Sequence, residues 1–115
     1  MPIQNELLYS TAAYPSMYIY DYENALLIKN RIAPALTQAN LMTQIWAYDH
    51  NIDHHRCPQT VRDNTSVNTV AWHCYSGGWD VLSQSHASNP TVLQYMTECW
   101  TPSTSPWYNA AAFAM

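Results

Sequence analysis

Short apolar runs that alternate with helical segments constrain this chain more than any other feature of its sequence. The runs that predict strands are Ile3–Asn5, Met42–Tyr48, Thr69–Tyr75 and Val92–Thr97. The intervening segments that predict helices are Tyr22–Leu36, Pro58–Asn64 and Trp79–Ser88. Strands that alternate with helices pair in parallel, because each crossover returns the chain to the same end of the sheet. The pattern therefore predicts an α/β fold of about four strand–helix units, built from parallel strands, within one domain.

The longest predicted helix, Tyr22–Leu36, has two notable positions near its ends. Asp21 is placed to act as its N-cap, because a carboxylate can accept the first free backbone N–H groups. Pro34 lacks a backbone N–H, so it should end or kink the helix. Apolar residues at helical spacing form the buried face, and they are Ala25, Leu26, Ile28, Ile32 and Leu36.

Two glutamates stand at predicted strand ends. Glu6 follows the run Ile3–Asn5, and Glu98 follows Val92–Thr97. In a barrel of parallel strands, catalytic groups collect at the carboxyl ends of the strands. A pair of carboxylates delivered there is what acid/base cleavage of a glycosidic bond requires. The two residues are about 90 positions apart, which matches three βαβ steps of about 30 residues and places them across an eight-stranded ring.

Composition narrows the class of protein further. Tyr and Trp are frequent, with nine and five copies, and each combines an apolar face with a polar tip, as sugars do. The net charge of −4 provides no electrostatic footprint for nucleic acid. No apolar run approaches the roughly 20 residues that span a bilayer. We therefore expect no nucleic-acid partner and no membrane span.

The features that bear on secretion point in different directions. Met1-Pro2-Ile3-Gln4-Asn5 has neither the basic start nor the apolar stretch of a signal peptide. Asn64-Thr65-Ser66 is an N-glycosylation sequon, which favours an extracellular parent protein.

The three cysteines are Cys57, Cys74 and Cys99, an odd number that makes no self-contained disulfide framework. Strand alternation turns Cys74 and Cys99 away from their neighbours His73 and Glu98, toward the helix layer. We read them as buried free thiols, which behave as small apolar residues. A disulfide between neighbouring strands is the alternative.

A histidine-rich segment raises a metal hypothesis. His50, Asp53, His54 and His55 offer imidazole and carboxylate groups at short spacing. The metalloprotease helix pattern with its glutamate is absent, and such a segment is more often a solvated loop. We predict no metal and no cofactor.

Ordered blocks then carry a family resemblance over almost the whole chain. The blocks are Gln4-Asn5-Glu6, Tyr14-Pro15-Ser16-Met17-Tyr18, Ile28-Lys29-Asn30 with Pro34-Ala35-Leu36, Tyr48-Asp49-His50-Asn51, Ala71-Trp72-His73-Cys74-Tyr75 and Thr97-Glu98-Cys99. In this order they resemble family 30 of the glycoside hydrolases, which includes glucosylceramidases and fungal endo-β-1,6-glucanases. The segment Thr97-Glu98-Cys99-Trp100-Thr101-Pro102 most closely resembles the secreted fungal members.

The resemblance implies a fold and a reaction. Residues 1–115 would be a fragment covering strands 4 to 7 of a (β/α)8 TIM barrel, a partial catalytic domain incomplete at both ends. The implied activity is that of a retaining β-glycoside hydrolase, secreted in its parent form, with a β-glucan or related carbohydrate as substrate. Glu6 matches the general acid/base and Glu98 the nucleophile. The first protonates the departing oxygen while the second attacks the anomeric carbon, and water then releases the sugar.

The same resemblance implies further site residues. Asn5 matches the residue that bonds the sugar 2-hydroxyl. His73 and Tyr75 lie on one side of their strand and face the active site in the family, where they would orient Glu98 or touch the sugar. His50 and Asn51 are further candidates at the next strand end. Trp100 and Trp107 are aromatic residues that either stack on sugar rings or belong to a core. Taken singly, Glu6 and Glu98 read as surface carboxylates and His73 as a buried structural histidine.

Two departures from the family pattern support an alternative to the enzyme interpretation. Leu7 stands where the family has proline after the acid/base. Strands 1 to 3 and 8 of the barrel, with their substrate contacts, have no counterpart here. The alternative reading is a catalytically inactive remnant with at most carbohydrate binding.

Overall fold

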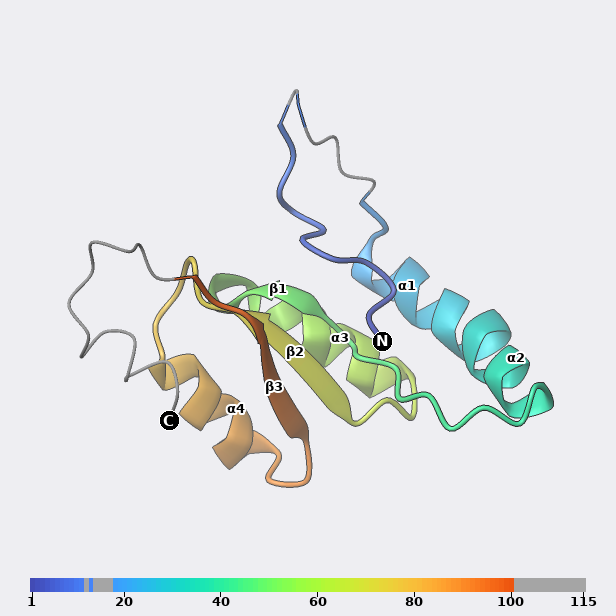
Figure 1. Ribbon diagram of the computed structural model, residues 1–115. Helices are drawn as coiled ribbons and strands as arrows, with labels where there is room; N and C mark the ends of the chain where they lie inside the picture. Colours follow the sequence, from blue (N-terminus) through green and yellow to red (C-terminus); the bar gives the residue numbers. More distant parts are fainter. Residues whose placement is uncertain (12, 14–17, 101–115) are drawn as a thin grey trace.

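The computed structural model describes residues 1–11, 13 and 18–100. The elements in chain order are α1 (Asp21–Leu27), the π-helix η1 (Ile28–Ile32), α2 (Ala33–Gln38), β1 (Asp49–Asn51), the 3₁₀ turn η2 (Ile52–His54), α3 (Arg56–Asn64), β2 (Thr69–His73), α4 (Asp80–Ser88) and β3 (Leu93–Glu98). Figure 1 shows the strands side by side with helices packed around them.

The three strands form one parallel sheet in the order β1-β2-β3. At their carboxyl ends Asn51 pairs with His73, and His73 pairs with Glu98. The helical crossovers α3 and α4 return the chain between the strands, as parallel pairing requires. The predicted α/β class with parallel strands is confirmed.

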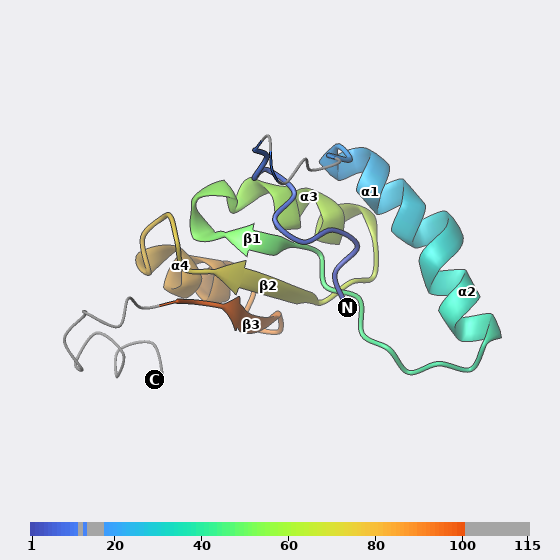
Figure 2. The same ribbon diagram turned by 45° about the horizontal axis from the view of Figure 1, so that its top comes forward.

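The first predicted strand is wrong. Ile3–Asn5 forms no strand, and the amino-terminal segment meets its neighbours through an isolated parallel bridge between Pro2 and Trp46 and a hydrogen bond from the N–H of Glu6 to the carbonyl of Asp49. Pro2 has no N–H to donate to a ladder, so the pairing does not propagate from it. Glu6, with a φ of 48°, then turns the chain away from the sheet. The segment still runs alongside β1, as Figures 1 and 2 show.

The second predicted strand begins too early. Regular pairing starts at Asp49, so Met42–Tyr48 precedes β1 where it was expected to form it. Ala47 donates its N–H to the carbonyl of Thr69, but Met42 is fully exposed. The apolar run predicted burial along its whole length, whereas only its end reaches the sheet.

The first helix runs as predicted in position but not in geometry. Residues 21–38 are helical throughout, with a π-helical stretch, Ile28–Ile32, that ends two residues before Pro34. Proline removes an i→i−4 hydrogen bond and its ring crowds the carbonyl of residue i−4, so a wider turn accommodates it. The N-cap is Tyr20, and Asp21 is the first helical residue. Among the described residues no helix combines the length and apolarity needed to cross a membrane.

The core lies between the sheet and the helices α1 and α3, which pack against each other. Every second side chain of β2 points into this core, because successive strand residues point to opposite faces of the sheet. The largest fully buried apolar side chains are Trp72, Ile28, Ile52, Val61 and Val70. Tyr48 stacks edge-on against Trp72, with ring centroids 5.5 Å apart.

The central strand β2 and the edge strand β3 differ in exposure. All five residues of β2 are buried, as expected of a central parallel strand. By contrast, most of β3 is exposed, including Leu93 (48%), Tyr95 (38%) and Met96 (37%). One edge of the sheet therefore presents apolar side chains to solvent.

Candidate active site

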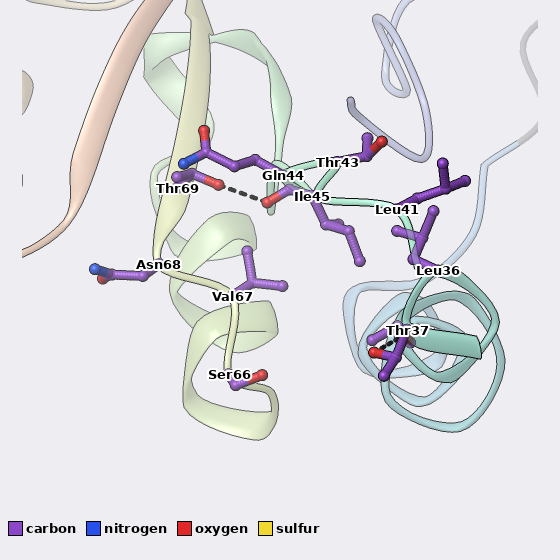
Figure 3. A pocket seen from close by; sticks show the side chains of 11 residues that line it. Leu36, Thr37, Leu41, Thr43, Gln44, Ile45, Ser66, Val67, Asn68 and Thr69 are labelled. Carbon is purple, nitrogen blue, oxygen red and sulfur yellow. Dashed lines mark hydrogen bonds between the residues drawn. The ribbon is translucent and has the colours of Figure 1, made fainter. Parts of the chain in front are cut away.

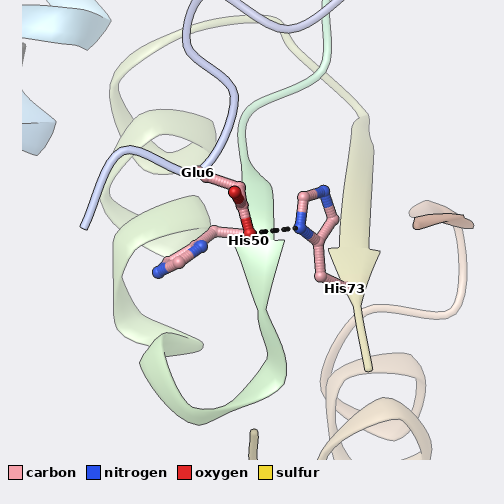
Figure 4. Close-up of side chains that lie close together, drawn as sticks. All are labelled: Glu6, His50 and His73. Atoms are coloured by element: carbon pink, nitrogen blue, oxygen red, sulfur yellow. Dashed lines mark ion pairs between the residues drawn. The ribbon is translucent and has the colours of Figure 1, made fainter. Parts of the chain in front are cut away.

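The buried imidazole of His73 lies at the centre of the candidate site. His73 ends β2, and its side chain is fully shielded from solvent. Its Nδ1 lies 3.6 Å from Oε1 of Glu6, and its Nε2 lies 3.6 Å from Oε2 of Glu98. Figure 4 shows the Glu6 carboxylate directed at this ring. One ring therefore brings together the two glutamates that are far apart in the sequence.

Glu6 is fixed by its backbone. Its N–H donates to the carbonyl of Asp49 at 2.9 Å, and its own carbonyl accepts from Tyr9. Its φ of 48° lies in the left-handed region, which is uncommon for a residue with a side chain. Such conformations cluster at functional sites, where the surrounding hydrogen bonds hold them.

A β-bulge places Glu98. The register shifts between Trp72 and His73, so that Trp72 pairs with Met96 and His73 pairs with Glu98. Thr97 is the extra residue of the bulge. Its hydroxyl donates to the carboxylate of Asp49 at 2.5 Å, while the adjacent Glu98 carboxylate reaches His73. Bulges re-aim side chains in this way, so consecutive residues can face one site.

Tyr75 contacts Glu98 directly. Its hydroxyl donates to Oε1 of Glu98 at 3.0 Å, and its ring lies edge-on to His73 at 6.1 Å. The backbone N–H of Tyr75 donates to Oδ1 of Asn51 at 3.0 Å. Asn51, at the end of β1, thus holds the position of Tyr75.

Asp49 is a site residue that the sequence reasoning missed. Its buried carboxylate lies 3.2 Å from Nε2 of His73. It pairs in register with Ala71, two residues before Asn51 and His73, and so points to the same face as they do. The predicted strand Met42–Tyr48 ends before Asp49, and the register that sets Asp49 opposite Ala71 is not visible in the sequence.

The electrostatic surroundings act on three groups. Burial alone lowers the pKa of His73, but its hydrogen bond to Asp49 and the charges of Asp49, Glu98 and Glu6 together raise the pKa above its usual value. Burial, with the nearby His73, lowers the pKa of His50. Partial burial and the hydrogen bond to Glu98 raise the pKa of Tyr75. His73 is thus the ring in this cluster that is favoured as a cation.

The remaining expected residues lie at the edges of this cluster. Asn5 and Trp100 are exposed, the first beside Glu6 and the second two residues after Glu98. Leu7, which stands in place of the family's proline, is buried in the core. Tyr14 and Trp107 lie outside the described residues.

The reading of two cysteines as free thiols is wrong. Cys74 and Cys99 form a disulfide, with their Cα atoms 5.1 Å apart. The two residues follow His73 and Glu98 on paired strands, so parallel pairing brings their side chains to the same side of the sheet. Cys57 is a free cysteine.

The side chains of the histidine-rich segment do not meet around one point, as the metal hypothesis required. His54 and His55 are exposed, and His50 stacks on His54 with ring centroids 6.4 Å apart. Within the described part of the chain, His50 instead converges with Glu6 and His73, each offering one ligand atom within 4.8 Å of the others (Figure 4). These three could hold a divalent ion, but they belong to the carboxylate–histidine cluster described above.

A separate hollow lies away from these groups. It has a volume of about 310 Å³ and lies between α2 and the segment that leads into β2 (Figure 3). Its lining, which includes Leu36, Leu41, Ile45 and Thr69, contains no carboxylate, histidine or cysteine. Thr69 begins β2, so the hollow is at the opposite end of the strand from His73.

Paired carboxylates at the carboxyl edge of a parallel sheet are typical of enzymes that hydrolyse glycosidic bonds. Comparison with known proteins points to the same class. Over 98% of its length, the chain is 58% identical to an endo-1,6-β-D-glucanase of Aspergillus fumigatus. It is 52% identical to endo-1,6-β-D-glucanases of Trichoderma harzianum and Neurospora crassa. The predicted resemblance to fungal endo-β-1,6-glucanases is confirmed.

A solved structure of an endo-β1,6-glucanase superposes on 89% of this chain with a TM-score of 0.80 at 25% sequence identity. No family model matches the chain. The chain spans about a quarter of the length of the relatives and of the solved structure that it matches.

Proposed function

We propose that this chain carries the catalytic centre of a retaining endo-β-1,6-glucanase. Its three parallel strands and the segment around Glu6 would be a section of a (β/α)8 barrel, with residues 1–115 forming part of one catalytic domain. The relatives named as endo-1,6-β-D-glucanases support the substrate class, a β-1,6-linked glucan.

One observation carries the proposal: Glu6 and Glu98 approach the two nitrogens of one buried ring at the carboxyl edge of the sheet. A shared ring keeps the carboxylates close, as a retaining mechanism requires, with about 5–5.5 Å between the carboxyl groups. Inverting enzymes hold them about 6.5–9.5 Å apart to admit a water.

In the proposed mechanism Glu98 is the nucleophile. The Tyr75 hydroxyl and the His73 ring both approach its carboxylate, at 3.0 and 3.6 Å, and hold it at the carboxyl edge of the sheet. Attack on the anomeric carbon forms the glycosyl–Glu98 bond as the bond to the departing oxygen breaks.

Glu6 is the proposed acid/base. It protonates the departing glycosidic oxygen, and then takes a proton from the water that displaces Glu98. Asn5 lies next to it and is proposed to bond the sugar 2-hydroxyl. Trp100, exposed beyond β3, is proposed as a stacking surface for a sugar ring.

Extracellular action is also part of the proposal. Asn64 of the sequon is exposed at the end of α3. An exposed acceptor is what N-glycosylation of a secreted protein requires.

The open edge of the sheet favours the second candidate for the chain taken alone. Apolar residues of β3 face solvent, and an uncovered strand edge is a liability in an isolated domain. We therefore expect the 115 residues on their own to bind glucan at most, without turnover.

The experiment uses a chimera in which this chain replaces the matching quarter of the A. fumigatus relative. Glu6→Ala and Glu98→Ala variants are assayed with and without azide. The substrate is a β-1,6-linked gluco-oligosaccharide with an activated aryl group as the β-glycosidic leaving group. Azide should restore turnover in both, with a β-glycosyl azide from the Glu6 variant and an α-glycosyl azide from the Glu98 variant. Full activity of the Glu98→Ala variant without azide would refute the assignment, and an Asp63→Ala variant serves as control.

A further inference from the structure

Asp49 is hydrogen-bonded to three parts of the proposed active site: Glu6, His73 and Thr97. Its backbone carbonyl accepts from the N–H of Glu6 at 2.9 Å. Its carboxylate lies 3.2 Å from Nε2 of His73 and accepts from the hydroxyl of Thr97, the residue before Glu98. One residue of β1 is thus connected to the two segments that carry the glutamates and to the ring between them.

The carboxylate of Asp49 is buried, with the residue only 5% exposed. A buried charge is unfavourable unless it is paired and hydrogen-bonded. The Thr97 hydroxyl and the His73 ring satisfy it here. This arrangement is therefore more than incidental contact between a surface acid and a histidine.

The contact between the Asp49 carboxylate and Nε2 of His73 fixes the orientation of the His73 ring. A hydrogen bond from one nitrogen of a histidine sets the orientation and tautomer of the other. With Nε2 held by Asp49, Nδ1 is directed toward Glu6, and it has no hydrogen-bond partner of its own. The groups that face His73 are Asp49 and His50 of β1, Tyr75 after β2, Glu98 of β3 and Glu6 of the amino-terminal segment.

We infer that Asp49 is a positioning residue for the glycosidase reaction: it holds the His73 ring so that one nitrogen faces each catalytic glutamate. The inference rests on the proposed function. Asp49 does not touch the sugar in this role and acts only through His73 and Thr97. The raised pKa of His73 agrees with it, since a carboxylate beside the ring favours the imidazolium form.

The test is Asp49→Asn in the glucanase chimera, which keeps the size of the side chain and removes its charge. We expect kcat on β-1,6-glucan to fall about 10- to 100-fold with KM little changed, because the lost bond involves a charged, buried pair. In protein labelled with [15N]histidine, the titration midpoint of His73 should move to lower pH. A merely structural role would not move that midpoint.

Asp63→Asn is the matched control, because Asp63 is an exposed carboxylate on α3. It should leave both kcat and the His73 titration unchanged. The inference is overturned if Asp49→Asn has the kinetics and the His73 titration of the parent chimera while Glu98→Gln is inactive. If Glu98→Gln is instead fully active, the proposed function itself fails.

Thr97→Val keeps the test decisive if Asp49→Asn does not fold. It removes one hydrogen bond to Asp49 and leaves every charge in place. We expect a loss in kcat of about 2- to 10-fold with a smaller shift of the His73 midpoint in the same direction. Parent values for both quantities would overturn the inference.

Discussion

At the scale of single residues, His73 has the most unusual surroundings. Its ring is buried, yet three carboxylates lie within 3.6 Å of its nitrogens. Its pKa is raised in the folded protein above the usual 6.5. Such a group adds stability that is fully present below the unfolded pKa and is lost as the pH rises through the folded pKa.

The first prediction concerns this pH dependence. Between about pH 6 and pH 9, the free energy of unfolding of the glucanase chimera should fall more steeply than that of its His73→Gln variant. The difference between the two should be largest near pH 6 and should shrink as His73 loses its proton. Urea unfolding at a series of pH values measures it. A difference that grows with pH would contradict the assigned direction of the shift.

The second prediction concerns Tyr75. Tyr75→Phe removes the hydroxyl that donates to Glu98 and keeps the ring. Because a hydrogen bond to a charged group is worth about 1.5–3 kcal/mol, kcat of the chimera should fall about 10-fold or more. Tyr22→Phe, on the exposed face of α1, is the control and should leave steady-state kinetics unchanged. Parent-like kinetics for Tyr75→Phe would remove its role in orienting Glu98.

Residue-level prediction from the sequence succeeded where strand ends and alternation were enough. His73 and Tyr75 could be placed on one side of their strand from period-two alternation. Asp49 and the disulfide could not be assigned in this way, because both depend on the register between strands. A one-residue shift at the bulge decides which residue lies opposite His73.

At the scale of elements, the carboxyl ends of β2 and β3 are tied together. The bulge at Thr97 aligns Glu98 with His73. The Cys74–Cys99 disulfide links the two residues that follow them. The N–H of Cys74 also donates to the carbonyl of Glu98 at 3.2 Å. The strand end that carries the proposed nucleophile is therefore fixed on both sides.

The third prediction concerns this disulfide. Its two cysteines are separated by 25 positions, so removing it as Cys74→Ala/Cys99→Ala should lower the free energy of unfolding by about 3–4 kcal/mol. Activity of the chimera should fall as well, because Glu98 follows the movement of Cys99. Equilibrium unfolding and glucan hydrolysis measure the two effects.

Cys57→Ala provides the control for the disulfide variant. Burial raises the pKa of the Cys57 thiol to about 12, so this cysteine remains a thiol and takes no part in the bridge. Cys57→Ala should keep the sensitivity to reductant that the double variant loses. A double variant as stable as its parent would show that the bridge does not brace the strand ends.

The fourth prediction concerns the loop between β2 and α4. Gly77 has a φ of 98°, and a Cβ at this position would lie 2.6 Å from the backbone nitrogen of Asp53. Gly77→Ala should lower the free energy of unfolding by about 1–3 kcal/mol or more, because neither the conformation nor the close backbone can relax. Thermal unfolding of the chimera measures the loss.

Gly78→Ala is the matched control for this loop. A Cβ at Gly78 would meet the carboxylate of Asp80, a side chain that can rotate away. The loss at Gly78 should therefore be the smaller of the two. Equal losses would show that the approach of Gly77 to η2 does not constrain the loop.

Element prediction failed where neighbouring segments override local pattern. The helices and the last two strands follow their periodicity to within a few residues. The segment Ile3–Asn5 does not, because Pro2 cannot extend a ladder and Glu6 reverses the chain. The π turn before Pro34 likewise depends on a backbone clash that periodicity does not describe.

At the scale of the whole molecule, the sheet is closed on one side and open on the other. Helices α1 and α3 cover the core beside β1 and β2, whereas apolar residues of β3 face solvent. The chain spans about a quarter of the endo-β1,6-glucanase structure that it resembles. The fold class was predictable from the alternation of elements, but the extent of burial was not, because it depends on what packs against β3.

The most direct test of the proposed function is to trap the covalent intermediate. The glucanase chimera is treated with a 2-deoxy-2-fluoro β-glucoside that carries a good leaving group, and its peptides are analysed by mass spectrometry. We predict time-dependent inactivation with the fluorosugar on Glu98, and protection by β-1,6-glucan oligosaccharides. A label on any other residue, or inactivation that persists in a Glu98→Gln variant, would contradict the assignment of Glu98 as the nucleophile.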